Sequence, residues 1–231
     1  VTTYAYDLAG RVTNQVDAAG LTTSLAYAQG GLVTTKTVPG GGTEITENYT
    51  DGKIKSITGT AFVPRYYSYD VDTDGTSWTL VSVGSSNSPM WELTTYDFLG
   101  RVQSIETPTV GIISNVYNTK GQLVQVVDPN RADTLYEYDE IGNQSASGFD
   151  VNENGLLDRA SLDQVAETEI TYQQDGADWW KVTASKIYPY DNSSTVLTNS
   201  IRQEKVSGSL DNVVEEIEDI DIYGQTTLSE T

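Results

Sequence analysis

A short motif recurs along this 231-residue chain at a spacing near 21 residues. The motif is a Tyr, an Asp or Asn, two variable residues, a Gly, a polar residue and usually an aliphatic one. Successive tyrosines at positions 6, 27, 49, 69, 96, 117 and 138 are separated by 21, 22, 20, 27, 21 and 21 residues. Clear copies begin at Tyr6, Tyr96, Tyr117 and Tyr138, and looser ones at Tyr49, where the motif is one residue shorter, and at Ile220. Such a period predicts a repeat protein.

Each repeat is suited to two short strands joined by a turn. Thr, Tyr and Val are abundant and favour strands, the Asp can accept backbone N–H groups in the turn, and the Gly can take a positive φ. The sequence therefore predicts an all-β fold of repeated antiparallel β-hairpins that form a long curled sheet or partial shell, with one short helix near residues 158–167. We expect a repeat sheet over 1–148, an inserted segment over 149–168, and a degenerate continuation of the same domain over 169–231.

The run Tyr6-Asp7-Leu8-Ala9-Gly10-Arg11-Val12 and its copies resemble the YD repeat of the bacterial Rhs proteins, and they are similar to the repeats of the teneurin shell. The match is strong over residues 1–143 and faint beyond them. The resemblance implies a secreted or surface-exposed strip of β-hairpins that spirals into a hollow shell. In some members of the family that shell encloses a toxic C-terminal domain.

Charge and composition exclude several functions. The chain has 13 Lys and Arg against 33 Asp and Glu, a net charge of −20, and neither His nor Cys. This charge opposes binding to nucleic acids, and the missing residue types exclude a Ser-His-Asp triad, thiol chemistry and zinc fingers. No apolar run approaches the ~20 residues of a membrane span. We therefore expect a non-enzyme with no nucleic-acid partner and no membrane insertion. The resemblance to the Rhs repeats further implies a protein that is secreted or on the bacterial surface, whose partners are other parts of a larger polypeptide or further copies.

A longer interval, between Tyr138 and Tyr172, contains a calcium-loop pattern. Oxygen-bearing side chains lie at its first, third, fifth and ninth positions, and Gly155 lies at the sixth. The segment resembles the calcium loops of EF-hands and of dockerin modules, and this resemblance implies that Ca²⁺ is held over 150–161 by Asp150, Asn152, Asn154, the Leu156 carbonyl and Asp158. Position twelve is Ser161, where that pattern has an acidic ligand, and Asp163 can substitute if the helix starts late.

A second acidic run follows Tyr69. Asp70, Asp72 and Asp74 alternate before Gly75, which is the front half of a calcium loop, so Ca²⁺ is also expected over 70–75. The rear half of the loop is missing. The alternative interpretation is a polar hairpin turn.

Together these features predict a calcium-stabilised structural segment of an extracellular repeat shell or surface assembly. One alternative is a module that binds carbohydrate or a protein partner through aromatic pairs such as Tyr66–Tyr67 and Trp179–Trp180. Another is the wall of a toxin-enclosing shell. A glycosidase pair drawn from the acidic run at 215–219 is disfavoured, because its alternation is typical of a solvated strand.

Overall fold

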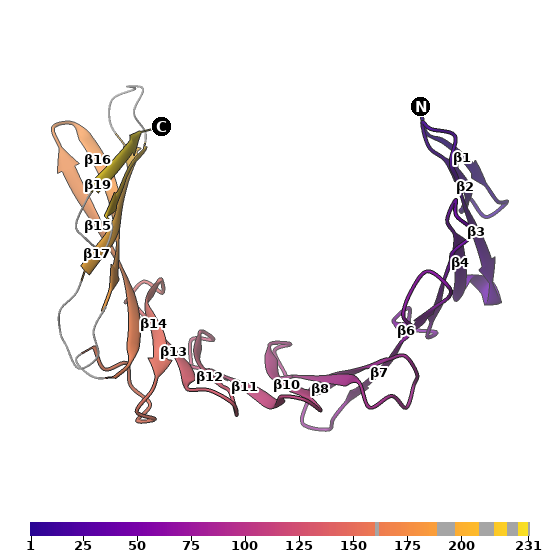
Figure 1. Ribbon diagram of the computed structural model, residues 1–231, viewed down its shortest axis with the longest axis horizontal. Coiled ribbons are helices and arrows are strands. Elements are labelled where there is room, and N and C mark those ends of the chain that lie inside the picture. Colours follow the sequence, from indigo (N-terminus) through magenta and orange to yellow (C-terminus); the bar gives the residue numbers. More distant parts are fainter. Residues whose placement is uncertain (160–161, 189–196, 208–214, 221–225, 231) are drawn as a thin grey trace. The chain divides into compact units, whose positions relative to one another are not determined.

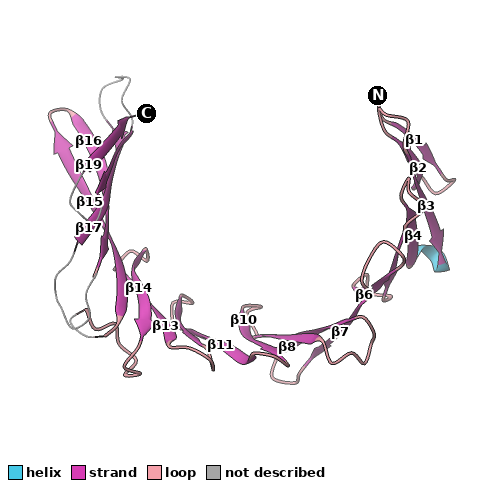
Figure 2. Ribbon diagram, in the orientation of Figure 1, coloured by secondary structure: helices cyan, strands magenta, loops and turns pink. Residues whose placement is uncertain are grey.

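The computed structural model describes residues 1–159, 162–188, 197–207, 215–220 and 226–230, and this part of the chain consists almost wholly of strands and turns (Figures 1 and 2). A single 3₁₀ turn in it, η1, spans Gln29–Gly31. The strands are β1 (Thr3–Tyr6), β2 (Val12–Val16), β3 (Thr22–Ala28), β4 (Val33–Thr37), β5 (Thr43–Asn48), β6 (Ile54–Thr58), β7 (Arg65–Val71), β8 (Ser77–Val83), β9 (Trp91–Tyr96), β10 (Val102–Thr107), β11 (Gly111–Tyr117), β12 (Leu123–Val127), β13 (Asp133–Tyr138), β14 (Gln144–Asp150), β15 (Gln164–Asp175), β16 (Asp178–Ile187), β17 (Leu197–Ser207), β18 (Glu215–Ile220) and β19 (Thr226–Glu230). Within the described residues, no helix is long and apolar enough to cross a membrane.

Strands pair antiparallel with the strand that follows them in the chain, from β1 to β10 and again from β11 to β19. The predicted all-β fold of repeated antiparallel hairpins is confirmed. The acidic run at 215–219 lies in β18, as its alternation indicated. The loose motif copy at 220–225 lies almost entirely outside the described residues.

The predicted helix near 158–167 is wrong. Residues 160 and 161 lie outside the described part, but from Gln164 onward the chain is strand β15. The alternation of buried Val165 with exposed Ala166 is the period of a strand, and both residues pair with β14. Strand pairing satisfies the backbone along a whole neighbour, which outweighs the weak helix preference of this short segment.

The chain divides into two compact units, residues 1–112 and 113–231. The first unit contains β1–β10 and the second contains β12–β19, and β11 begins at the end of the first. The sequence-based division at residues 148 and 168 follows the repeat pattern and stays a prediction.

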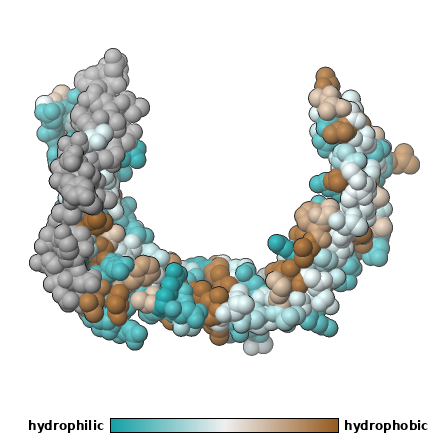
Figure 3. All heavy atoms as spheres, viewed as in Figure 1, coloured by the Kyte–Doolittle hydropathy of each residue, from teal (hydrophilic) through white to brown (hydrophobic). Residues whose placement is uncertain are grey.

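Little of the chain is buried. The buried apolar side chains of the described residues all lie in the second unit: Leu135, Ala146, Leu157, Val165 and Val182. In the first unit the buried side chains are small and polar, Ser56 and Ser82. Figure 3 accordingly shows many apolar side chains (brown) at the surface. Backbone ladders and turns, more than a central core, therefore hold the repeats.

The Tyr-Asp motif forms one repeated turn. At Asp7 the backbone N–H donates to the Arg11 carbonyl (2.9 Å) and the Asp7 carbonyl accepts from Gly10 N–H (3.0 Å). The Asp7 carboxylate accepts from the N–H groups of Ala9 and Arg11, both at 2.9 Å, and from the Arg11 guanidinium at 2.8 Å. Gly10 has φ 79°, and the ladder has a bulge at Tyr6. This is a three-residue hairpin loop closed by a left-handed glycine.

The same backbone bonds recur at Asp97, Asn118 and Asp139, and they correct the sequence alignment at Tyr49. At the turn that follows β5, Tyr49 itself takes the Asp position, because its N–H donates to the Lys53 carbonyl (2.8 Å). That turn is therefore not shorter than the others. After β7 the equivalent residue is Asp72, whose N–H donates to the Thr76 carbonyl (2.7 Å), and not Asp70.

Tyrosine side chains link one hairpin to the next. Tyr27 donates its hydroxyl to the Val12 carbonyl at 2.9 Å, and Tyr138 makes the equivalent bond to the Leu123 carbonyl at 2.8 Å. The Arg11 guanidinium lies 4.3 Å from the centre of the Tyr27 ring. The motif therefore closes its own turn through Asp and Arg and binds the neighbouring repeat through Tyr.

Candidate metal centre in the loop between β14 and β15

The loop that joins β14 to β15 is anchored by one leucine. Leu157 is 5% exposed and packs with Leu135 of β13, Ala146 of β14 and Val165 of β15. Gly148 permits this close approach, since an added Cβ would lie 3.1 Å from Leu157 Cδ2 and 2.4 Å from the Gln164 carbonyl oxygen. The loop is thus folded against the sheet.

Two buried carboxylates organise the loop. Asp150 is 2% exposed and accepts from the N–H groups of Asn154 (3.0 Å) and Gly155 (2.7 Å). Asp163 is 4% exposed and accepts from the N–H groups of Val151 (2.9 Å) and Asp158 (2.9 Å). A buried carboxylate is tolerated only when such donors surround it, so these two residues fix the path of the backbone at both ends of the loop.

The remaining side chains with predicted ligand oxygens lie together. The Asp158 carboxylate accepts from the Asn152 amide at 3.0 Å and from the Asn154 amide at 2.5 Å. These two bonds hold the pKa of Asp158 below its usual range. The Leu156 side chain is 64% exposed. Asp150, Asn152, Asn154 and Asp158 therefore belong to one hydrogen-bonded loop, as the sequence pattern predicts.

The loop also borders a concentration of negative charge that the sequence analysis missed. Asp133 of β13 lies directly opposite Asp150 in the ladder with β14, an arrangement that is unfavourable for two like charges. Both residues line a polar hollow of about 780 Å³, together with Asn154 and with Asp128, which pairs with Arg131 of the same hollow at 2.7 Å. Gln125 donates to the Asp133 carboxylate at 2.8 Å. Only the strand register reveals this pairing.

The carboxylates of this loop could provide only part of the oxygen ligands that a hard divalent cation requires. Among the described residues, no three acidic side chains are grouped so as to hold a metal by themselves, so an ion would also draw on the amide oxygens of Asn152 and Asn154. Carboxylate, amide and carbonyl oxygens are the ligands that Ca²⁺ prefers. Ser161 lies outside the described residues. Asp163, which the sequence offers as a substitute, is buried in the loop and already accepts two backbone bonds.

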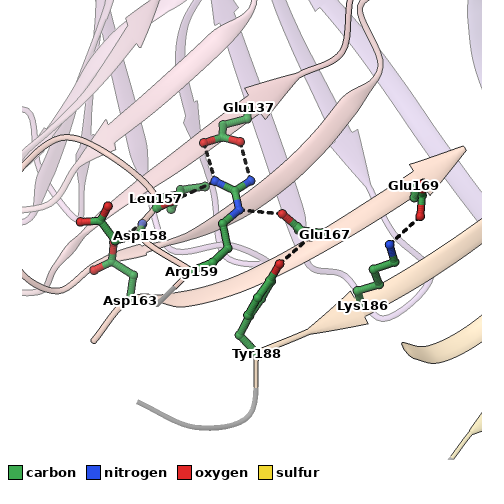
Figure 4. Close-up of polar contacts among 9 residues, drawn as sticks. All are labelled: Glu137, Leu157, Asp158, Arg159, Asp163, Glu167, Glu169, Lys186 and Tyr188. Carbon is green, nitrogen blue, oxygen red and sulfur yellow. Dashed lines mark hydrogen bonds and ion pairs between the residues drawn. The ribbon is translucent and has the colours of Figure 1, made fainter. Parts of the chain in front are cut away.

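Arg159 joins the loop to the sheet through ion pairs, and no sequence motif indicated this residue. Arg159 pairs with Glu137 of β13 (2.6 and 3.0 Å) and with Glu167 of β15 (2.6 Å), as Figure 4 shows. It also donates to the Leu157 carbonyl at 2.9 Å, while the Tyr188 hydroxyl donates to Glu167 at 3.0 Å. The Glu137 and Glu167 carboxylates raise the pKa of Arg159, which stays charged. Its only sequence signal is a lone cation in an acidic loop.

The second predicted site forms a tight turn. Asp74 accepts from the Thr76 N–H (2.9 Å) and hydroxyl (2.6 Å), and this hydroxyl also lies 3.4 Å from Asp72. These bonds lower the pKa of Asp74. Asp70 lies before the turn in β7, where its carboxylate accepts from the Val71 N–H (2.8 Å). The geometry is that of the polar hairpin turn, and calcium at 70–75 stays a prediction.

The adjacent aromatic pairs do not form flat platforms. Tyr66 lies opposite Ser82 and Tyr67 opposite Val81, so alternation puts the two rings on opposite faces of β7. Trp179 and Trp180 alternate in β16 in the same way; Trp179 is 42% exposed, and the Lys205 ammonium lies 5.3 Å from the Trp180 ring.

Residues 6–43 match the RHS repeat family. This segment contains the turn at Asp7 and the Tyr27 bond that couples it to the next hairpin. The chain therefore carries an RHS repeat at this position. No curated protein matches the chain.

Several solved structures are similar to the chain over nearly its whole length. The crystal structure of TcdB2-TccC3-Cdc42 has 13% identity and a TM-score of 0.33, covering 99% of this chain and 10% of that one. The Photorhabdus luminescens Tc holotoxin pore has 12% identity and a TM-score of 0.32, covering 99% of this chain and 17% of that one. The chain thus spans a small part of these proteins, and likeness at this level carries no argument about its function.

Proposed function

We propose that the chain is a structural segment of a bacterial extracellular Rhs-type repeat sheet, serving as part of a shell or surface assembly. The observation that carries the proposal is the turn closed by the same backbone bonds at Asp7, Asp97, Asn118 and Asp139. A turn that recurs in both units, with tyrosine links between hairpins, supports a sheet that extends by adding repeats. Its partners are other parts of the same larger polypeptide or further copies, and its role is non-catalytic.

Surface labelling of the producing bacterium tests this role. Antibodies raised against the chain should label intact cells or detect it in the culture medium, and external protease should remove the cell-bound signal. A cytoplasmic protein serves as the control for lysis. Signal that appears only after the cells are broken contradicts an extracellular role.

A narrower form of the proposal is the wall of a toxin-enclosing shell, which the Rhs resemblance implies. In the full-length protein, such a shell would protect an enclosed domain from added protease. Equal digestion before and after unfolding of the repeat sheet would rule this form out.

We further propose that Ca²⁺ stabilises the loop between β14 and β15. Asp150, Asn152, Asn154, Asp158 and the Leu156 carbonyl would hold it, with hard oxygen ligands throughout. What supports this is the buried Asp150 carboxylate facing Asp133 across the ladder, beside a polar hollow. The ion would reduce repulsion between these carboxylates and couple its binding to the folding of the loop.

Calcium titration tests this proposal. A weak site with a Kd of about 0.1–1 mM should raise the free energy of unfolding by about 1–3 kcal/mol in 10 mM CaCl₂ relative to EDTA. Asp158→Asn should abolish most of this gain; because Asp158 is only half-buried, the variant can be expected to fold. Magnesium at the same concentration should have a smaller effect. Isothermal titration that shows no heat at millimolar calcium would contradict the site.

The stoichiometry of the same titration decides the second site. If the 70–75 turn binds calcium, the wild type should take up two ions and Asp74→Asn one. One ion in both proteins would leave this segment as a polar turn.

A further inference from the structure

One face of the sheet at β7–β9 contains an aromatic hollow that the structural role does not use. The hollow has a volume of about 510 Å³. Its floor is formed by side chains of β8 and β9, among them Trp78, Leu80, Leu93 and Trp91, and its rim by Asp72 and by Ser86, Asn87 and Ser88 of the β8–β9 loop. The four apolar side chains are half-buried. All residues from 65 to 107 are described.

The register between β8 and β9 brings the side chains of this floor together. Leu80 lies directly opposite Leu93, and Ser82, which is 5% exposed, lies opposite Trp91. Trp78 precedes Ser82 by four positions on the same face, so the two indoles are separated by roughly 13 Å along the strands. Ser82 is the smallest side chain in the row Trp78, Leu80 and Ser82 on this face of β8. The result is an extended apolar floor with an indole at each end.

Negative charge surrounds this floor. Asp72 lines the hollow itself. Asp70 lies opposite Trp78, and Glu106 of β10 lies opposite Leu93, so both belong to the same face. The one cationic residue in the sequences of β7–β10 is Arg65, which lines a different hollow with Tyr67 and Val83. The face therefore combines two indoles and three carboxylates in a chain of net charge −20.

We propose that this face binds a basic, partly apolar polypeptide segment. Lys or Arg head groups would meet Asp70, Asp72 and Glu106, while their alkyl stems and the apolar neighbours would cover the leucines. The indole faces attract cations as well. Anionic ligands would be repelled. This inference goes beyond the structural role. Because Asp70 and Asp72 are also predicted ligands of the 70–75 calcium site, the peptide is titrated in the presence of EDTA.

A peptide titration tests the proposal. The probe is a short synthetic peptide that alternates Lys with Leu, and its counterpart carries Glu in place of Lys. By calorimetry at low salt the basic peptide should bind, the acidic one should not, and the affinity should fall as salt is added. Trp78→Ala and Trp91→Ala should each weaken binding about tenfold.

Two further variants separate loss of the site from loss of the fold. Ser86→Trp places a bulky group on the exposed rim without touching the ladder, and it should also weaken binding about tenfold if it fills the hollow. Asp72→Asn should weaken binding several-fold and reduce its dependence on salt. Circular dichroism should show that both variants keep the strand content of the wild type.

Matched controls lie in the second unit. Trp179→Ala removes an exposed indole and Asp175→Asn removes one exposed carboxylate, and neither should change peptide binding. Equal losses in controls and hollow variants would mean general attraction to an acidic surface, which overturns the proposal. So would failure of the wild type to bind the basic peptide, or Trp78-dependent binding of cellohexaose in its place.

Discussion

The turn at Asp7 and the loop from Asp150 to Asp163 both use an aspartate to collect backbone N–H groups, but they differ in what else holds them. The turn is closed within five residues, and its Leu8 side chain is fully exposed. The loop depends on residues distant in sequence: Leu157 packs on three strands, and Arg159 joins Glu137 to Glu167. The turn is a local structure, whereas the loop requires the finished sheet.

The turns and the β14–β15 loop stabilise the protein in different ways. Local turns fix the register of each hairpin and can be repeated indefinitely, since each contains its own hydrogen bonds. The loop supplies burial that a single exposed sheet lacks. We therefore expect substitutions in the loop to cost more than substitutions in a turn.

The largest effect is expected at Leu157. Leu157→Ala should lower the free energy of unfolding by about 2–5 kcal/mol, because it opens a cavity among Leu135, Ala146 and Val165. Chemical denaturation measures the change. The adjacent Leu156→Ala is the control: this side chain is 64% exposed, so its loss should cost within about 0.5 kcal/mol. Equal costs at the two positions would contradict the packing of the loop.

A smaller loss is expected at Arg159. Arg159→Met should cost about 2 kcal/mol, because it removes charge-assisted hydrogen bonds to two carboxylates. The comparison is Arg131→Met. The Arg131 side chain is more exposed than that of Arg159 and pairs with the single carboxylate of Asp128, so its loss should cost less than about 1 kcal/mol. If chemical denaturation gives the same loss in the free energy of unfolding for both variants, Arg159 does not hold the loop to the sheet.

In the local turns a glycine pair offers a matched test. Gly41 has φ 83° in a turn whose Val38 and Gly42 form the same backbone bonds as the Tyr-Asp turns, whereas the adjacent Gly40 is not in the left-handed region. Gly41→Ala should therefore cost about 1–2 kcal/mol. Gly40→Ala should be neutral or slightly stabilising, because it restricts the unfolded chain. Thermal unfolding of the two variants gives the comparison.

The smallest effect is expected at Asp7, on the loss of thermal stability at acidic pH. The N–H of Arg11, then its guanidinium, lower the pKa of Asp7. The stabilisation is therefore fully present above the pKa of Asp7 in the unfolded chain, about 3.9, and is lost as the pH falls through the lower pKa of the folded protein. Asp7→Asn should show a smaller decrease in Tm than the wild type between about pH 5 and pH 2. An equal decrease would mean that this carboxylate does not contribute.

Much of the molecule could be predicted from the chain alone. The period of the tyrosines and the Asp and Gly of each turn predict the hairpins because their hydrogen bonds are local. Asp150, Asn152, Asn154 and Asp158 lie in one short hydrogen-bonded loop, and their role as calcium ligands stays a prediction. The alignment at Tyr49 failed because the turn is defined by its backbone bonds, which Tyr49, Gly52 and Lys53 form although a tyrosine takes the Asp position.

The repeating unit follows from the amino-acid sequence because its hydrogen bonds are local: two strands joined by a turn that usually has Asp or Asn and a Gly at fixed positions. Which distant side chains meet is settled only in the folded sheet. Strand register determines three of these contacts. It places Asp133 opposite Asp150, brings Glu137 within reach of Arg159, and puts Trp78 and Trp91 on one face. A shift of one residue would move each side chain to the other face. The turns set the register locally, but the side chains that come to face each other lie many residues apart in the chain.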